Sequence, residues 1–289
     1  MSKDEEINRF EDNFSSEIIE IDAVTGASGF GAGKAGKDIL WSASIELIAW
    51  KIHGPNNEII NEKYKLESLV DDEGLNKLRD LIKEESIIRV KVSVRKDSSM
   101  KYLKLVEVIQ SSYQDKELNE ILQESIKPVF YEDEILGKME LNKRINTFET
   151  EVDWVESTVF ISFDNDDEES IKDYASTAHE LCNNKADWNE KIISFAAEKL
   201  LDLANDWYAE SREEYYESFD PDFEEEDEYF KYETITKERF MELIEIQEII
   251  VYSDGEFTVY CSDGDIFLGH SIIVSGNING EFDYAEMAG

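Results

Sequence analysis

Alternating apolar and polar residues near the end of the chain give its clearest structural pattern. Apolar Phe257, Val259 and Cys261 alternate with Thr258 and Tyr260, which is the two-residue period of a β-strand. Two Ser-Asp-Gly triplets flank this run, and Asp-Gly supplies the positive φ angles that a two-residue hairpin turn requires. We therefore predict a tight antiparallel meander in the last forty residues, running from Ile249 to Leu268 and continuing in a strand at Ser271–Gly276.

A second group of short β-patterns occupies the front of the chain. The strand candidates are Trp41–Ile52, Ile59–Leu66, Ile87–Arg95 and Tyr102–Ile109. A short amphipathic helix is predicted at Gly74–Ile82, between the second and third strands. These lengths fit a small β-barrel of the oligonucleotide-binding type.

The third front strand has one apolar and one basic face. Its outward residues are Arg89, Lys91, Ser93 and Arg95. An anion could bind there, but a solvated outer face of a half-buried sheet is the favoured interpretation.

Further strands are predicted at 129–141, 147–154 and 157–163, before the helices of the second half. Helices follow at 166–181 and 188–207. In the second helix, apolar residues recur every three or four positions and predict a buried stripe. Its members are Trp188, Ile192, Ala196, Leu200, Leu203 and Trp207.

These patterns predict an α+β fold with three parts. Residues 1–38 are expected to be a flexible segment that contains a glycine-rich loop. Residues 39–128 form a small β-rich domain with a C-terminal linker helix. Residues 129–289 form an acidic α+β domain of antiparallel sheet and helices that ends in the β-meander.

The glycine-rich loop lies between Thr25 and Lys37. Gly31–Gly36 matches the dinucleotide pattern G-x-G-x-x-G, and Gly31–Lys37 matches most of a P-loop. Both motifs require the glycines to open a helix that faces the phosphates. Asp38 stands where a P-loop needs Ser or Thr, and the following residues are typical of a strand, so a flexible loop or hinge is favoured over a nucleotide site.

Charge is the dominant feature of the composition. The chain has 29 basic and 68 acidic residues, for a formal net charge of -39, and residues 129–289 hold 43 of the acidic residues but 11 of the basic ones. Such a field repels nucleic acid and anionic membranes and attracts basic surfaces.

The sequence has two cysteines and no run that resembles a membrane span or a signal peptide, so we expect a cytoplasmic protein without disulfides.

One acidic segment also carries aromatic residues. Residues 213–228 contain ten acidic residues and no Lys or Arg. A charged block of this kind is typical of a mobile loop, but interleaved rings allow docking on a basic partner. The predicted partner-binding residues are Tyr215, Tyr216, Phe219, Asp222, Phe223, Glu224, Glu225, Glu226, Asp227 and Glu228.

The sequence contains few groups of residues that could form a catalytic or metal site. His179-Glu180-Leu181-Cys182-Asn183 begins like the zinc motif H-E-x-x-H, but Asn183 replaces the second histidine. His270 and Ser271 are adjacent strand residues, which point to opposite faces and cannot form a triad. The acidic run at 164–168 lacks the glycine and glutamate of a calcium loop. We therefore assign no catalytic residue, no cofactor and no metal ligand.

The second half resembles a bacterial family of uncharacterised domains. The motifs that carry the resemblance are Glu151-Val152-Asp153-Trp154, Ala197–Trp207 and the meander ending in Gly269-His270-Ser271-Ile272-Ile273-Val274-Ser275-Gly276. The resemblance covers about half of the chain and implies no established activity. By analogy, the members are similar in style to immunity proteins of toxin systems.

The sequence favours a non-enzymatic, acidic protein-binding inhibitor of the immunity or phage anti-defence type. It would mimic nucleic acid and block a basic, nucleic-acid-binding surface of a partner such as a nuclease or toxin, without binding nucleic acid or membrane itself. The alternative is an enzyme or small-ligand module that uses the glycine-rich loop or carboxylates of the C-terminal domain. A third option is a homo-oligomer whose acidity keeps it soluble.

Overall fold

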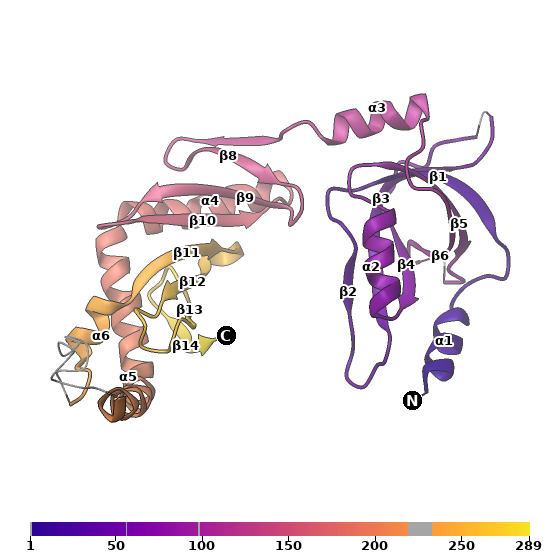
Figure 1. The fold of residues 1–289 in the computed structure, drawn as a ribbon. Coiled ribbons are helices and arrows are strands. Elements are labelled where there is room, and N and C mark those ends of the chain that lie inside the picture. Colours follow the sequence, from indigo (N-terminus) through magenta and orange to yellow (C-terminus); the bar gives the residue numbers. More distant parts are fainter. Residues whose placement is uncertain (1, 56, 98, 219–232) are drawn as a thin grey trace. The chain divides into compact units, whose positions relative to one another are not determined.

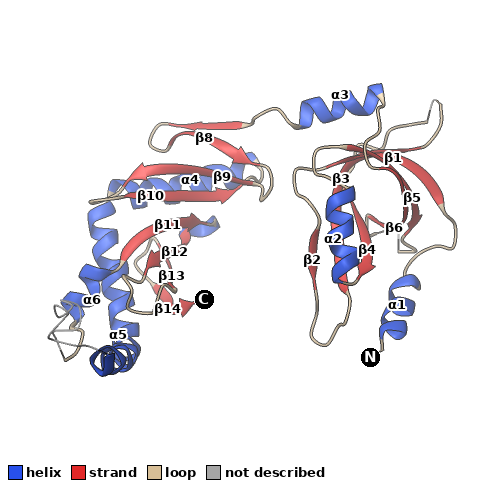
Figure 2. Ribbon diagram, viewed as in Figure 1, coloured by secondary structure: helices blue, strands red, loops and turns tan. Residues whose placement is uncertain are grey.

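The structure is a computed structural model that divides into two compact units. It describes residues 2–55, 57–97, 99–218 and 233–289. The front unit comprises Met1–Pro128 with Lys143–Ile145, and the C-terminal unit comprises Val129–Asn142 with Asn146–Gly289. The front unit is β-rich and the C-terminal unit combines helices with a meander-containing sheet (Figure 2), so the predicted α+β fold class is confirmed.

The front unit is built on a closed barrel. Its elements are α1 (Lys3–Glu11), β1 (Ile19–Thr25), β2 (Gly31–Gly33), β3 (Trp41–Ile52), β4 (Tyr64–Val70), α2 (Asp72–Leu81), β5 (Ile87–Val94), β6 (Tyr102–Gln110) and α3 (Lys116–Ser125). β1 pairs with β3 and β5, β3 with β4, β4 with β6 and β6 with β5. These pairings close a ring of five strands, with α2 between its third and fourth members, as in an oligonucleotide-binding barrel.

The barrel core follows from strand alternation. Ile88, Val90 and Val92 of β5 are fully buried, as their two-residue spacing predicts. Leu75 and Leu78 of α2 join the same apolar cluster and cover the barrel interior. The strand predicted at 59–66 is shifted, because β4 begins only at Tyr64.

The glycine-rich loop is a strand extension rather than the start of a helix. Gly31–Gly33 forms β2 and pairs with Ser42–Ser44 of β3, so the loop folds back along the barrel strand that follows it. The next element after β2 is β3 itself. The helix N-terminus that a P-loop or dinucleotide motif requires is therefore missing from this segment.

The chain begins with a helix, whereas the sequence suggested a loose terminus. α1 starts with a capping box in which the Ser2 Oγ accepts from the Glu5 N–H and the Glu5 carboxylate accepts from the Ser2 N–H. The acidic and polar residues of α1 form no apolar stripe, and for this reason hydrophobic periodicity did not reveal it.

The C-terminal unit is a single eight-stranded sheet with helices on one face. Its elements are β7 (Phe130–Asp133), β8 (Gly137–Asn142), β9 (Thr147–Asp153), β10 (Thr158–Asp164), α4 (Glu168–Asn183), α5 (Lys185–Ser218), α6 (Lys237–Leu243), β11 (Glu245–Val251), a 3₁₀ turn η2 (Ser253–Gly255), β12 (Glu256–Ser262), β13 (Ser271–Asn277) and β14 (Phe282–Ala288). The strands lie in the order β14 to β7, and β10 pairs parallel with β11 while all other neighbours are antiparallel. Two four-stranded meanders thus meet at β10 and β11, with α4 to α6 forming the connection between them (Figure 1).

The long helix α5 packs along the sheet through its apolar stripe. Trp188, Ile192, Ala196 and Leu200 are buried as predicted. Beyond Leu200 the buried positions are Ala204 and Tyr208, while Leu203 is 37 % exposed and Trp207 is half-buried. On a helix of 3.6 residues per turn, Ala204 and Tyr208 lie to one side of the predicted stripe, so the buried side of α5 changes direction beyond Leu200. In the described ranges no helix has the length and apolar character needed to cross a membrane.

The first Ser-Asp-Gly triplet is a hairpin turn as predicted, but the second is not. Asp254 and Gly255 have φ angles of 60° and 77° and join β11 to β12. After β12, residues 263–269 form a compact loop in place of the predicted strand at 265–268. The carboxylate of Asp263, 4 % exposed, accepts from the backbone N–H groups of Asp265, Phe267 and Gly269, and this buried hydrogen bonding fixes the loop.

Candidate functional site

The side of the C-terminal sheet opposite the helices is the main candidate surface. Side chains alternate along β10 and β12, so Val159 and Phe257 join the core with α5 while Phe160 and Tyr260 project from the other side. No helix of the described residues joins a core cluster on this other side. We call it the open face and define it by the outward residues of β8 to β14.

The strand register gathers the outward residues into two rows. The first row runs across six strands through Glu151, Phe160, Glu248, Tyr260, Ile273 and Glu286. The second row runs across seven strands through Glu140, Glu149, Ser162, Ile250, Thr258, Ser275 and Tyr284. The first row alternates carboxylates with rings and an aliphatic side chain. In the second row Glu140 and Glu149 lie at one end and Tyr284 at the other, and Ser162 and Thr258 between them are buried.

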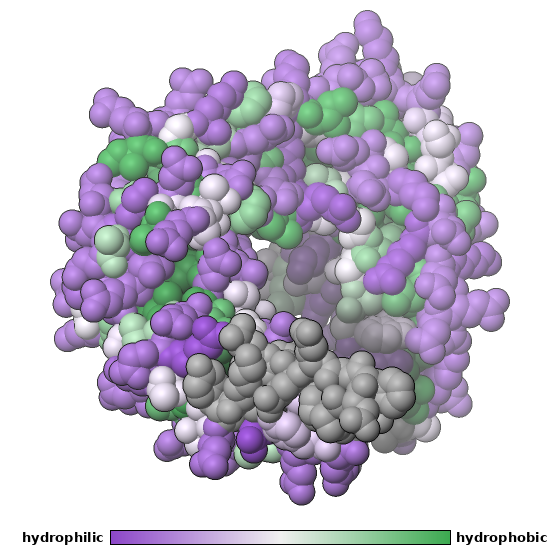
Figure 3. Space-filling model, turned by 60° about the vertical axis from the view of Figure 1, so that its left-hand side comes forward, coloured by the Kyte–Doolittle hydropathy of each residue, from purple (hydrophilic) through white to green (hydrophobic). Residues whose placement is uncertain are grey.

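Large apolar side chains on this face are exposed to solvent. Phe160 is 55 % exposed and Tyr284 is 44 % exposed. Exposed aromatic side chains set in a polar surround are typical of protein-binding surfaces, where Tyr and Phe are enriched. In the view of Figure 3, hydrophobic residues likewise occur in separate patches among hydrophilic ones.

The strands of this sheet are almost devoid of positive charge. Lys138 is their one basic residue, and it lies over the ring of Phe130 at 3.7 Å from the centroid. The acidic residues of the eight strands are Glu132, Asp133, Glu140, Glu149, Glu151, Asp153, Asp164, Glu245, Glu248, Glu256, Asp283 and Glu286. The sheet therefore favours cationic groups on its surface.

A groove on the open face shows what such a surface can bind. It has a volume of about 390 Å³, and Glu140, Glu149, Glu151 and Phe160 contribute to its lining. A guanidinium or ammonium group placed there would meet carboxylates and the face of an aromatic ring, which together make charge-assisted and cation–π contacts. The groove is suited to a Lys or Arg side chain of another protein.

The partner-binding residues predicted from the sequence lie mostly beyond the described part of the chain. Tyr215 and Tyr216 are on the last turns of α5, with their ring centroids 5.1 Å apart, and the Arg212 guanidinium lies 4.9 Å from the Tyr216 ring. The remaining predicted residues, Phe219, Asp222, Phe223 and Glu224 to Glu228, lie outside the described residues. Their role in binding stays a prediction.

The open face was not identified from the sequence. Alternation in the run Thr158–Asp164 shows that Phe160 points away from Val159 and Ile161, and this signal was present. The neighbours of Phe160 could not be inferred from the sequence. The parallel pairing of β10 with β11 places Phe160 beside Glu248, and these residues are 88 positions apart.

The histidines are engaged in structural contacts. His53 Nδ1 lies 2.9 Å from the buried Asp22 carboxylate, and His179 Nε2 lies 2.8 Å from the Asp133 carboxylate. His270 Nδ1 bonds to the carbonyl of Phe267. No cluster of His, Cys, Asp and Glu in the described ranges has metal-binding geometry.

Cys261 is buried and Cys182 is half-buried, and neither has the properties of a reactive thiol. Burial raises the pKa of Cys182 to about 11 and that of Cys261 to about 12. Both are free. A nucleophilic cysteine needs the opposite shift, because the thiolate is the reactive form.

The basic residues on the outer side of β5 are paired with acids. Arg89 donates to Asp22 at 2.9 Å, Lys91 pairs with Glu107 at 2.7 Å and Arg95 lies 3.7 Å from Glu67. Neutralised cations of this kind offer little free charge to a phosphate backbone. This agrees with the favoured interpretation of the strand as an outer barrel face.

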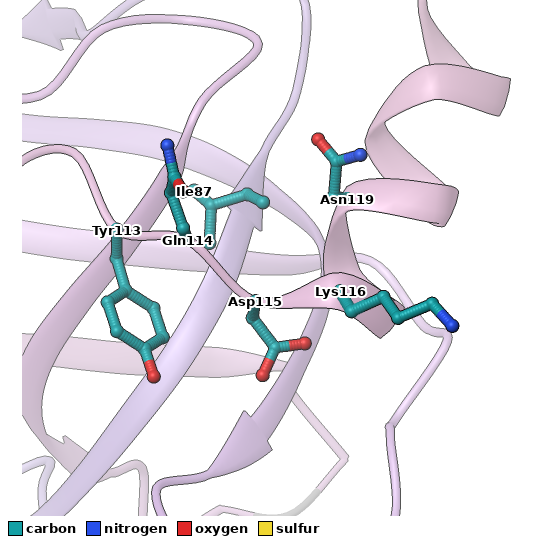
Figure 4. A pocket seen from close by; sticks show the side chains of 6 residues that line it. All are labelled: Ile87, Tyr113, Gln114, Asp115, Lys116 and Asn119. Atoms are coloured by element: carbon teal, nitrogen blue, oxygen red, sulfur yellow. The ribbon is translucent and has the colours of Figure 1, made fainter.

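A cavity of about 460 Å³ lies at the junction of β6 and α3 (Figure 4). Tyr113 and Asp115 extend to one side of the connecting segment, and Gln114 extends to the other. The Asp115 carboxylate binds Lys51 at 2.8 Å and accepts from the N–H groups of Glu117 and Leu118. Its charge is thus used to attach α3 to the barrel, which makes this cavity a weaker candidate than the open face.

Residues 133–287, more than half of the chain, match the model of DUF2262, described as an uncharacterized protein conserved in bacteria. The chain belongs to this family. Residues 6–125 match the model of DUF7021, a domain of unknown function. No match was found among the curated proteins or the solved structures. The resemblance seen in the sequence is thereby confirmed, and DUF2262 supplies no activity to transfer.

Proposed function

We propose that this DUF2262 protein is a non-enzymatic inhibitor that binds a basic protein in the cytoplasm. The C-terminal unit would cover a positively charged surface of its partner, of the kind that otherwise binds nucleic acid. Immunity proteins of toxins and phage anti-defence proteins act in this general manner. The open face carries the proposal, because it combines exposed rings with two rows of carboxylates.

Charge complementarity favours a basic protein as the occupant. Acidic residues recur on the open face from β8 to β14, and Lys138 is the one basic residue in the strands. Nucleic acid and anionic membranes would be repelled by the same field. The alternating rings supply the apolar area that a specific interface needs at its centre.

The alternative of an enzyme or small-ligand module receives less support. The glycine-rich loop lacks the helix that phosphate binding requires, the three histidines are engaged in the fold, and both thiols have raised pKa values. Carboxylates of the C-terminal unit remain available for chemistry, but they are spread over an exposed surface without a partner base or nucleophile in the contacts described above.

The test is a capture experiment with three forms of the full chain. The open-face variant carries Glu149→Gln, Glu151→Gln and Phe160→Thr, and Thr retains β-propensity. The control variant carries Glu190→Gln and Glu198→Gln, which remove the same charge from exposed positions on α5. Each form is immobilised, exposed to lysate of the native host and washed at low and at high salt.

The proposal predicts a basic protein that the wild type and the control variant retain at low salt and the open-face variant loses. High salt should release it, since exposed charge pairs are screened. Equal retention by all three forms, or the lack of a specific basic partner, would contradict the proposal.

A further inference from the structure

A cavity in the front unit lies between α1 and the outer side of β3 and β4. It has a volume of about 410 Å³, within the range of small-molecule sites. α1 is attached over it mainly by polar contacts, since Glu6 is the one buried residue of this helix. The Glu6 carboxylate accepts from the backbone N–H groups of Ile39 and Leu40, at 3.0 and 3.2 Å. The helix therefore covers a polar space and does not fill it with apolar side chains.

Five charged side chains line this cavity. The Glu6 carboxylate is engaged by the backbone of Ile39 and Leu40, and the other four side chains form two loose pairs. The Arg9 guanidinium lies 3.5 Å from the Asp38 carboxylate, and the Arg95 guanidinium lies 3.7 Å from the Glu67 carboxylate. Within the described part of the chain, none of these four side chains makes a hydrogen bond. By contrast, Arg89 on the same barrel makes a 2.9 Å hydrogen bond to Asp22.

One of the two pairs, Glu67 with Arg95, is also held in place by its surroundings. The side chains of Glu67 and Arg95 are 14 % and 23 % exposed. Arg95 lies near the rings of Phe14 and Tyr102, at 5.9 and 5.0 Å from their centroids. Burial raises the pKa of the Glu67 carboxyl, and the nearby Arg95 and Lys65 offset this only in part. A cationic donor next to Glu67 would compensate for that burial.

The balance of charges defines the class of ligand. Two guanidinium groups can bind a carboxylate, and the two carboxylates can bind an ammonium group. A simple anion would face the carboxylates of Glu6, Asp38 and Glu67, and a simple cation would face two guanidinium groups. The remaining wall includes Phe10, Leu40 and Leu69, which suit an apolar side chain.

We propose that this cavity binds a free α-amino acid with an apolar side chain. Arg9 and Arg95 hold its carboxylate, Asp38 and Glu67 hold its ammonium group, and its side chain lies against Leu40 and Leu69. The site is in the front unit and is independent of the open face, so it adds a ligand-sensing role to the proposed inhibitor.

Isothermal titration of the full chain with L-leucine tests this site. N-acetyl-L-leucine and L-leucinamide are the matched probes, because each retains the side chain and loses one of the two charges. We expect saturable binding of L-leucine and at least about tenfold weaker binding of both analogues, since a charge-assisted hydrogen bond is worth that factor or more. Failure of L-leucine to bind, or equal binding of the three compounds, would overturn the proposal.

Variants locate the binding within the cavity. Glu67→Gln and Arg95→Gln should each weaken L-leucine binding at least about tenfold. Arg9→Gln should weaken it too, and because this side chain is 62 % exposed its replacement removes no buried packing. The control is Lys91→Gln, which lies on the same barrel and pairs with Glu107 outside the cavity. Unchanged binding in Arg9→Gln and Glu67→Gln, or an equal loss in Lys91→Gln, would contradict the assignment.

Discussion

Ion pairs to a buried lysine attach α3 to the front barrel. Lys51, 5 % exposed, lies 2.8 Å from Asp115 and 3.0 Å from Glu117. Burial acts to lower the pKa of Lys51, but its hydrogen bonds to the two carboxylates outweigh this effect and raise it. Removing one member of such a pair leaves an uncompensated buried charge, which is strongly destabilising.

Asp115 makes the attachment of α3 dependent on pH. Burial acts to raise the pKa of Asp115, but hydrogen bonds from Lys51 and from the N–H groups of Leu118 and Glu117 outweigh it, so the pKa lies below its ordinary value of 3.8. A carboxyl with a lowered pKa stabilises the fold above its unfolded-state pKa and loses this contribution as pH falls through the folded-state value.

Amide hydrogen exchange should therefore show α3 opening more readily as pH falls from about 5 to about 3. Asp115→Asn should reduce this pH dependence. Glu120→Gln, an exposed change on the same helix, should leave it as in the wild type. An undiminished pH dependence in Asp115→Asn would show that the attachment does not rest on this carboxylate.

At this scale the sequence revealed which side chains point inward but not what they touch. Phe257, Val259 and Cys261 are buried and Tyr260 is partly exposed, as predicted, whereas Thr258, predicted on the other side, is also buried. The contact between Asp22 and His53 joins residues 31 positions apart, and the antiparallel pairing of β1 with β3 brings them together. Sites made of such contacts, including Glu67 with Arg95, have no local sequence signal.

Among the elements, the loop between β12 and β13 shows how one short motif can have two outcomes. Asp-Gly forms the hairpin turn at 254–255, whereas at 263–264 it opens a loop around the buried Asp263 carboxylate. In both places the motif supplies positive φ angles at glycine. The outcome at the second motif depends on tertiary burial of Asp263, which the sequence pattern does not encode.

The same loop contains Gly264, and we expect its replacement by alanine to destabilise the fold. A Cβ atom there would lie 2.3 Å from the carbonyl oxygen of Leu243, at the end of α6, and the φ angle is +56°. Gly264→Ala should lower the free energy of unfolding by at least about 2 kcal/mol, because it combines a backbone clash with a left-handed conformation.

Gly280→Ala is the matched control. Gly280 also has a positive φ of +85°, but a Cβ there meets nothing within 4 Å. Urea unfolding of the full chain measures both variants, and we expect a loss of only about 1 kcal/mol for Gly280→Ala. Equal losses would show that the close approach to Leu243 is unimportant.

Most elements were predictable because their periodicity is local. The strand at Trp41–Ile52 has the predicted bounds, and the helices of the second half lie where their apolar spacing placed them. The sheet orders were not predictable, because the parallel pairs β4–β6 and β10–β11 join segments that are separated by whole elements.

At the scale of the whole molecule, charge and architecture support the same proposal. The acidic excess belongs to residues 129–289, and the strand register there produces a face with carboxylates between exposed rings. Composition revealed the negative sign of this unit's charge, and a basic partner stays a prediction. The face itself depends on the eight-stranded order, so it became visible only in the structure.

The most direct measurement is carboxyl footprinting of the full chain, alone and with the basic partner recovered by capture. Carbodiimide coupling reports the accessibility of each carboxylate by mass spectrometry. The account predicts that the reactivity of Glu149, Glu151 and Glu248 falls on binding, while that of Glu190 and Glu198 on α5 is unchanged. Protection of the α5 carboxylates with no change on the open face would contradict it.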